Sequence, residues 1–252
     1  MNEFFQITQF QGALVLICGL LIGLSKSGVR GAGMIVVPIM ASIYGGKLSS
    51  GVVLPMLSFA DLFAVMYYNR HAEWKYVWKL LPWTMAGIGI GVVTGEAVSD
   101  VVFKQLIGAI VIVGLGIMVW QDIKRKKSSS ISIPDAWYYS ALFGLAGGFS
   151  TMIGNSAGAI MAIYLLSMHL PKNSFIGTGA WFFLIVNLSK IPFHALVWKT
   201  ITLETLTFNL TLTPLIAVGA FIGIKVVKKI PERPYRIFVI CITFLSSVLL
   251  FI

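Results

Sequence analysis

The chain has 252 residues, of which 58% are hydrophobic and only 11% are charged. A soluble domain has about 45–50% apolar and about 25% charged residues, so this composition indicates a protein with several membrane-spanning helices. No hydrophilic stretch is long enough for a separate soluble catalytic or ATP-hydrolysing domain. The net charge of +10 is expected from cytoplasmic loops rich in Lys and Arg, and does not indicate nucleic-acid binding.

Ten apolar segments follow one another along the chain, with a polar, basic linker at residues 122–135 between the fifth and the sixth. The first segment lacks the basic n-region and the cleavage site of a signal peptide, so we expect a retained helix. Cys18 and Cys241 lie in apolar segments and are expected to be small buried side chains rather than a disulfide or a metal site. The segments lie at 10–24, 31–44, 50–68, 77–95, 101–121, 136–149, 156–168, 174–197, 205–227 and 235–252.

The five segments after the linker repeat the five before it. An offset of 125 residues aligns GLLIGLS at 19–25 with GLAGGFS at 144–150. Beyond an insertion near 200–212, an offset of 132 residues aligns Gly87 with Gly219. We therefore predict a first repeat at 1–121, the linker at 122–135 and a second repeat at 136–252.

Basic residues in the loops predict that the two repeats have opposite orientations in the membrane. The linker contains the run KRKK at 124–127 and is expected in the cytoplasm, which places both termini outside. Counting segments from the linker places loop 96–104 outside and its repeat partner, loop 228–236, inside. Such inverted-topology repeats are common in secondary transporters.

The first two segments of each repeat are short and meet at a polar, glycine-rich break, at 25–33 and at 150–158. A helix of about 14 residues rises about 21 Å, which is less than the roughly 30 Å of the hydrocarbon core. Each pair is therefore either two tilted spans or a re-entrant hairpin, and the loop charges fit both. The predicted fold is an all-α polytopic membrane protein of eight to ten membrane segments.

The two breaks contain most of the candidate substrate-binding side chains. Non-helical backbone at membrane depth is tolerated only inside protein or beside a wet cavity, and helix N-termini favour anions. Lys26 adds an ammonium group, and the other donors are Ser25, Ser27, Ser150, Thr151 and Asn155. Together they predict a pocket for a small oxyanion. The alternative is that Lys26 and Arg30 lie at a membrane boundary and reach lipid head groups.

Two further charges, Asp61 and Lys190, lie near the centres of apolar segments, where an unpaired charge is costly. Asn187, Lys190 and His194 share one helix face by their spacing. We expect this face to meet the face of Asp61 and to line the transport path. Asp61 either carries a proton during transport or forms a static ion pair with Lys190 or Lys26. His194 is nearer to a helix end and is expected at the membrane interface.

Three stretches resemble the TauE/SafE permeases, also described as sulfite exporters: GLSKSG (23–28), LPMLSFADLFA (54–64) and FIGTGAWFFLIVNLSKIPF (175–193). The resemblance extends over about residues 10–250. It implies an inner-membrane protein of two homologous halves that moves small anions, often sulfite or organosulfonates. The matching positions are Ser25, Lys26, Asp61, Asn187 and Lys190. Ser27, Arg30 and Asn155 depart from the family pattern, which bears on the substrate more than on the fold.

The predicted function is secondary transport of a small anion by alternating access, with export of sulfite or a related sulfur oxyanion or organosulfonate as the first interpretation. Asp61 is the candidate for proton coupling. The alternatives are a membrane enzyme or assembly factor that binds a lipid or quinone, and a passive anion channel. We predict no catalytic residues, cofactor or metal site. The expected partners are the anionic substrate and membrane lipids, and the oligomeric state is left open.

Overall fold

The structure, a computed structural model, describes residues 7–29, 33, 36–94 and 136–249. These residues form helices joined by turns, and no strand occurs among them, as the composition predicts. Three features singled out from the sequence lie outside the described residues, namely the segment at 101–121, the linker at 122–135 and Arg30.

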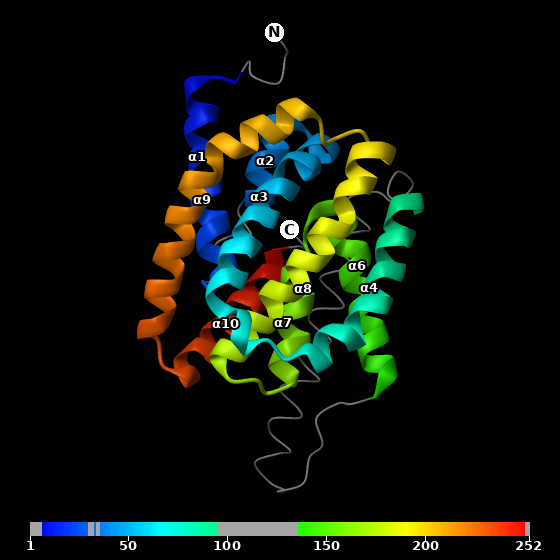
Figure 1. The fold of residues 1–252 in the computed structure, drawn as a ribbon, viewed down its shortest axis with the longest axis vertical. Coiled ribbons are helices and arrows are strands. Elements are labelled where there is room, and N and C mark those ends of the chain that lie inside the picture. The colour runs from blue at the N-terminus through cyan, green and yellow to red at the C-terminus, as the bar shows by residue number, and fades with distance from the viewer. Residues whose placement is uncertain (1–6, 30–32, 34–35, 95–135, 250–252) are drawn as a thin grey trace, which may run out of the picture. The chain divides into compact units, whose positions relative to one another are not determined.

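The helices follow the order of the apolar segments. Up to residue 94 they are α1 (Gln9–Lys26), α2 (Val36–Tyr44), α3 (Gly46–Tyr68), the 3₁₀ turn η3 (Asn69–His71) and α4 (Trp74–Thr94). From residue 136 they are α6 (Trp137–Gly154), α7 (Gly158–Ser167), α8 (Lys172–Pro192), the π-helical turn η4 (Phe193–Val197), α9 (Leu203–Lys229) and α10 (Glu232–Leu249) (Figure 1). Within the described part, five stretches are long and apolar enough to cross a membrane: Gln9–Lys26, Leu48–His71, Trp74–Thr94, Lys172–Val197 and Leu203–Lys229.

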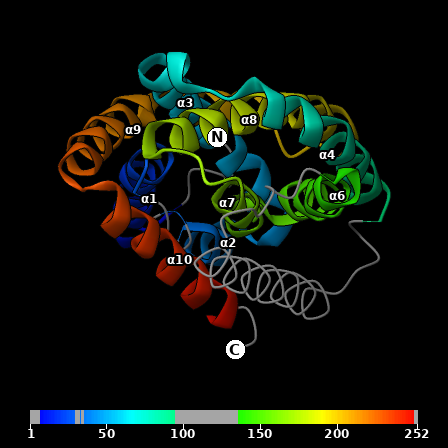
Figure 2. The ribbon, with the colours of Figure 1, turned by 90° about the horizontal axis from the view of Figure 1, so that it is seen from below.

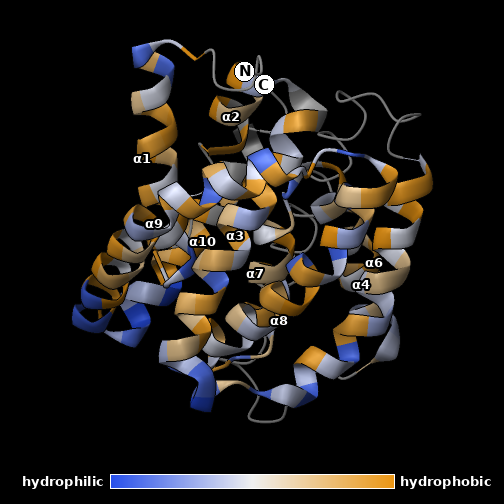
Figure 3. Ribbon diagram, turned by 45° about the horizontal axis from the view of Figure 1, so that its top comes forward, coloured by the Kyte–Doolittle hydropathy of each residue, from blue (hydrophilic) through white to orange (hydrophobic). Residues whose placement is uncertain are grey.

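Large apolar side chains are exposed along the helices. On α9 they include Leu210, Val218 and Phe221, while Lys228 and Lys229 lie in its last turn. Figure 3 shows this distribution, with hydrophobic residues along most of α9 and hydrophilic residues at its end. A soluble monomer rarely exposes so much contiguous apolar surface, whereas lipid tails match it. The described helices therefore have the surface of a multi-pass membrane protein.

The two helices that begin each repeat have unequal lengths, which the sequence did not predict. α1 and α6 have 18 residues each, whereas α2 has 9 and α7 has 10. At about 1.5 Å per residue the long helices rise about 27 Å, and the short ones only about 15 Å. α1 and α6 are thus longer than the predicted segments of about 14 residues, and the described parts of α2 and α7 are shorter. α1 begins before its apolar run because Thr8 and Gln11 form a capping box at its N-terminus.

The chain divides into two compact units, and each contains helices from both predicted repeats. Unit 1 comprises Met1–Arg70 and Ala180–Ile230, hence α1, α2, α3, the second part of α8 and α9. Unit 2 comprises His71–Gly179 and Pro231–Ile252, hence α4, α6, α7, the first part of α8 and α10. The predicted repeats are stretches of sequence, so they divide the chain differently from these spatial units.

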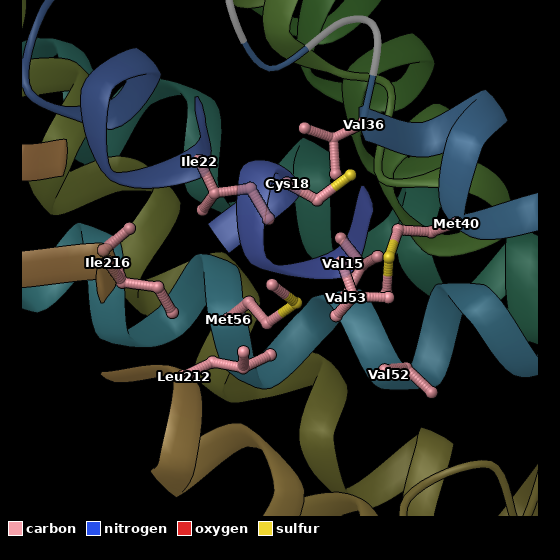
Figure 4. Close-up of a cluster of buried hydrophobic side chains, with 11 residues drawn as sticks. Val15, Cys18, Ile22, Val36, Met40, Val52, Val53, Met56, Leu212 and Ile216 are labelled. Atoms are coloured by element: carbon pink, nitrogen blue, oxygen red, sulfur yellow. The ribbon is translucent and has the colours of Figure 1, made fainter. Parts of the chain in front are cut away.

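In unit 1, α1 and α9 lie side by side (Figures 1 and 2). The apolar core of this unit joins α1, α2, α3 and α9, and its buried members include Cys18, Met40, Met56 and Ile216 (Figure 4). Cys18 is thus a small buried hydrophobic side chain, as expected. Cys241, in unit 2, is exposed, contrary to that expectation; it lies on α10, where the apolar pattern did not reveal which face packs.

Glycine lets α1 and α9 approach until their backbones touch. A Cβ atom on Gly23 would collide with the carbonyl oxygen of Ile216. A Cβ atom on Gly219 would likewise collide with the carbonyl oxygen of Leu20. Each helix therefore has a glycine against which one turn of the other helix packs.

The same contact occurs in unit 2, between α4 and α6. A Cβ atom on Gly148 would collide with the carbonyl oxygen of Thr84, and one on Gly87 with that of Leu145. Leu20 and Gly23 lie 125 residues before Leu145 and Gly148, and Ile216 and Gly219 lie 132 residues after Thr84 and Gly87. The two sequence offsets therefore relate the contacts of unit 1 to those of unit 2. The internal repeat seen in the sequence is thus matched by a repeated helix contact, in which the first helix of each repeat packs on the fourth helix of the other.

Two glycines on α4 allow this contact to be tested within one helix. We expect Gly87→Ala to lower the free energy of unfolding by about 1–3 kcal/mol or more, because the added methyl group meets backbone that cannot move aside. Gly89→Ala is the matched control, since no atom lies within 4 Å of its added Cβ, and it should be neutral or slightly stabilising. Unfolding of the purified variants in detergent measures both. Equal stability of the two variants would contradict the close contact.

Candidate functional site

The C-terminus of α1 positions the first charged side chain of the site. The amide of Val29 donates to the carbonyl oxygen of Leu24, and that of Gly28 to Ser25, which is the Schellman pattern. Gly28 has a φ of 123°, a conformation that other residues rarely adopt. Lys26 lies in the last helical turn, where the helix dipole favours a cation. The sequence Ser-Gly after Lys26 thus ends the helix and leaves the ammonium group at its end.

Lys26 forms an ion pair with Asp61 of α3. The Lys26 Nζ atom lies 2.9 Å from Oδ1 and 3.1 Å from Oδ2 of the carboxylate. Asp61 is completely buried, and the Lys26 side chain is 15% exposed. The alternative in which Lys26 reaches lipid head groups does not match this inward placement. An ion pair this far from water is favourable only when its remaining groups have partners as well.

Two residues of α8 complete the surroundings of this ion pair. Asn187 Nδ2 donates to Asp61 Oδ2 over 2.6 Å. The ring of Phe183, one turn earlier, lies 4.1 Å below Lys26 Nζ, a cation–π contact. The carboxylate therefore accepts from an ammonium and an amide group, and the ammonium group is held between a carboxylate and an aromatic face.

Lys190 lies one helical turn beyond Asn187 and is completely buried. Its charge interacts with those of both Lys26 and Asp61. The three ionisable side chains all belong to unit 1. Two lysines and one aspartate give this group one net positive charge when all three are ionised. We call Lys26, Asp61, Asn187 and Lys190 the charge cluster.

His194 lies beyond the charge cluster, in the π-helical turn that follows Pro192. Its Nδ1 is 2.9 Å from Thr200 Oγ1, and its carbonyl oxygen accepts from the amide of Thr200 over 2.8 Å. The side chain is completely buried inside the protein. Its position at the membrane interface stays a prediction. The chain after η4 folds back over the ring, and the helical pattern did not show this. Its Nε2 atom has no hydrogen-bond partner among the described residues.

The serines of the first break lie close to Lys26. Ser25 is in the last turn of α1, and its side chain lies against Gly33, where a Cβ atom would be 2.9 Å from the Ser25 hydroxyl. Ser27 is completely buried, and its hydroxyl has no hydrogen-bond partner in the described part of the chain. An unsatisfied buried hydroxyl is uncommon and is consistent with a position that a ligand or water contacts.

The second break is shorter than the sequence predicted and belongs to unit 2. α6 continues through Ser150 and Thr151 to Gly154, so these two residues are helical. Asn155 ends the helix in the left-handed conformation, with a φ of 54°. Ser150 is completely buried, and among the described residues its hydroxyl, like that of Ser27, has no partner. The break thus comprises only residues 155–157, because asparagine can adopt the left-handed conformation without glycine.

The sequence identified the ionic members of the site but not their neighbours. Phe183 lies on the same face of α8 as Asn187, four residues earlier, so helical spacing could have identified it. Thr200 follows the π-helical turn, and no sequence pattern predicted that turn. The described residues contain no group of three or more His, Cys, Asp or Glu side chains that could hold a metal ion.

Comparisons with known proteins agree with the architecture. The family model "Sulfite exporter TauE/SafE" matches residues 15–250. Two curated relatives share the description "Probable membrane transporter protein MamO": the protein of Magnetospirillum gryphiswaldense is 24% identical, and that of Paramagnetospirillum magneticum is 23% identical. Each match covers 64% of this chain and 31% of the relative, so the chain spans about a third of their length. No solved structure matches the chain significantly.

The ion pair can be tested with a double-mutant cycle. Lys26→Met should lower the free energy of unfolding by about 3–5 kcal/mol, because it leaves a buried carboxylate without its closest cation. Asp61→Asn together with Lys26→Met should be less destabilising than the sum of the two single changes. Reversible unfolding in mixed micelles measures the cycle. Lys225→Met, at an exposed lysine of α9, is the control and should change little. Additive single effects would contradict a direct Lys26–Asp61 interaction.

Proposed function

We propose, because the chain belongs to the TauE/SafE family of membrane proteins, that it is a permease for a small anion. The family description names sulfite, and we propose sulfite or a related sulfur oxyanion or organosulfonate as the substrate. The curated relatives named probable membrane transporter proteins support transport rather than catalysis. Direction, substrate and mechanism are our proposals for this chain.

The charge cluster is the observation that carries the proposal. Charged side chains within membrane segments are costly and usually belong to substrate or ion pathways. Here Lys190 and Asp61 are completely buried in helices that are apolar enough to cross a membrane. Lysine ammonium groups and amide N–H groups are the donors that bind an oxyanion. When all three groups are ionised, the net positive charge of the cluster favours an anion over a cation.

Asp61 is the group through which we propose proton coupling. It is the only acidic residue within the ten apolar segments of the sequence. Protonation of its carboxyl group would break the ion pair with Lys26 and release a cation to the substrate. This gives a direct physical link between one proton and one anion, in an alternating-access cycle.

We also propose that the chain is an inverted repeat, with halves at 1–121 and 136–252 joined by a cytoplasmic linker at 122–135. The repeated glycine contacts support duplication, since the two sequence offsets relate them residue by residue. The basic loops support an inner-membrane orientation with both termini outside. The short α2 and α7 favour re-entrant segments over full spans at these positions.

Transport assays in proteoliposomes test the function directly. We expect saturable movement of sulfite, and either stimulation or inhibition by a pH gradient. Sulfate, thiosulfate and taurine serve as alternative substrates in the same assay. Lys26→Met and Lys190→Met should each lower the flux at least about tenfold, because each removes a cation from the anion path. Lys225→Met is the control and should retain the flux. Absence of saturable movement for all four compounds would contradict the proposal.

The two unpartnered serines test the breaks separately. Ser27→Ala and Ser150→Ala remove hydroxyl groups that make no hydrogen bond to the described residues, so protein stability should hardly change. If each hydroxyl contacts the substrate, the substrate concentration for half-maximal flux should rise about tenfold, as for a lost hydrogen bond to an ion. Ser42→Ala is a suitable control, because Ser42 is exposed and its hydroxyl donates to the Ile39 carbonyl oxygen. Unchanged kinetics in both serine variants would remove them from the proposed site.

A further inference from the structure

We propose that Asp61 holds the place of the substrate: its carboxylate occupies the donors of Lys26 and Asn187 until an oxyanion head group replaces it. The inference rests on the proposed function and specifies how the charge cluster admits an anion. Asp61 then competes with the substrate for the donors of Lys26 and Asn187, and it is not part of the surface that binds the substrate.

The contacts of the carboxylate are those that a small oxyanion would make. Both oxygens of Asp61 lie within 3.1 Å of Lys26 Nζ, and Oδ2 accepts from Asn187 Nδ2 over 2.6 Å. A sulfonate or sulfite presents two or three oxygens on one atom, at a spacing close to that of a carboxylate. The donors that hold Asp61 are therefore of the kind that such a head group binds.

An anion cannot share these donors with an ionised Asp61. The carboxylate is completely buried, and two negative charges a few ångströms apart repel strongly where water is excluded. The carboxylate must therefore be protonated or move away before an anion takes its place. If one anion enters as one proton neutralises Asp61, a monovalent anion leaves the charge of the cluster unchanged.

Lys190 makes the exchange selective for anions. Lys190 adds a second buried amine to the cluster, and when both lysines are ionised the cluster remains positive with a neutral Asp61. Loss of the carboxylate contact then leaves two ammonium groups close together, and their mutual repulsion is relieved by an incoming anion. A cation or a neutral solute does not relieve the repulsion between the two ammonium groups.

Other titratable groups lie near Asp61, and a test of pH-dependent anion binding must separate its protonation from theirs. α1 contributes Lys26 and α8 contributes Lys190, and His194 interacts with Lys190 further along the chain. α9 directs Lys228 to the ring of Tyr67 at the end of α3, and the titratable Tyr44 of α2 contacts Phe208. Among these described groups, Lys190 and His194 are therefore the residues that must be distinguished from Asp61 by experiment. Asp61→Asn separates Asp61 from Lys190, and His194→Gln separates Asp61 from His194.

Methanesulfonate is the appropriate probe, because it stays monovalent at every pH used and any pH dependence then belongs to the protein. Its dissociation constant for the purified protein in detergent is measured by calorimetry between about pH 6 and about pH 8, the range in which histidine also titrates. We expect binding to weaken as the pH rises, by up to about tenfold per pH unit for one linked proton.

Asp61→Asn should bind methanesulfonate at least as tightly as the wild-type protein at the low pH, with less than about a twofold change across the range, because the competitor is absent at every pH. His194→Gln should keep the wild-type pH dependence. Thermal unfolding of each variant shows whether it is folded, and the wild-type pH dependence tests the proposal without any substitution.

Four outcomes would overturn the proposal: no methanesulfonate binding to the wild-type protein, wild-type binding that does not change with pH, loss of binding in folded Asp61→Asn, or loss of the pH dependence in His194→Gln. Saturable sulfite flux in proteoliposomes alongside any of these would leave the permease function standing. Failure of both binding and flux would contradict the permease function as well.

Discussion

The free-energy cost of burying a charge away from water is the constraint on which the interior of unit 1 depends. Asp61 is completely buried in the middle of α3, and it persists there because Lys26 and Asn187 satisfy it from two other helices. An ion pair of this kind does not by itself stabilise a fold, since desolvation offsets much of its attraction. Its value is geometric, because it joins α1 and α8 to α3 through contacts of 2.6–3.1 Å.

That arrangement in turn depends on how closely α1 packs in its unit. In lipid there is no hydrophobic driving force between helices, so small residues that permit close packing become important. Gly23 is three residues before Lys26 and lies against the backbone of α9. The contact fixes the height and rotation of the end of α1, and the Schellman turn at Gly28 then ends the helix. Packing by glycine thus supports the position of the ammonium group.

Much of this organisation could be predicted from the sequence. Hydropathy located the long helices, and the order of glycines predicted a repeat; glycine contacts occur at the corresponding positions of both units. Helical spacing placed Asn187 and Lys190 on one face, and the cost of a lone charge required a partner for Asp61. The choice of Lys26 as that partner could not be made, because it depends on where α1 ends and how α8 packs.

Other features followed from local chemistry that periodicity does not record. The capping box of Thr8 and Gln11 extends α1 beyond its apolar residues, and Asn155 ends α6 without a glycine. The π-helical turn after Pro192 brings Thr200 onto His194 and buries the histidine side chain inside the protein. Each of these depends on one or two residues, whereas hydropathy averages over a whole turn or more.

The proposed repeat is symmetric in its glycine contacts but not in its charges. At the offset of 125 residues, Lys26 corresponds to Thr151 and Asp61 to Val186, so the equivalent positions of the second repeat carry no charge. Gly23 and Gly148, by contrast, are both glycine and both lie against backbone. A helix crossing tolerates no added atom, whereas a charged position tolerates a neutral residue once its partner is gone as well. Duplication would therefore preserve the glycine contacts and allow the ion pair to be confined to one unit. Among the described residues, the charge cluster of unit 1 is where we propose that an anion and a proton compete.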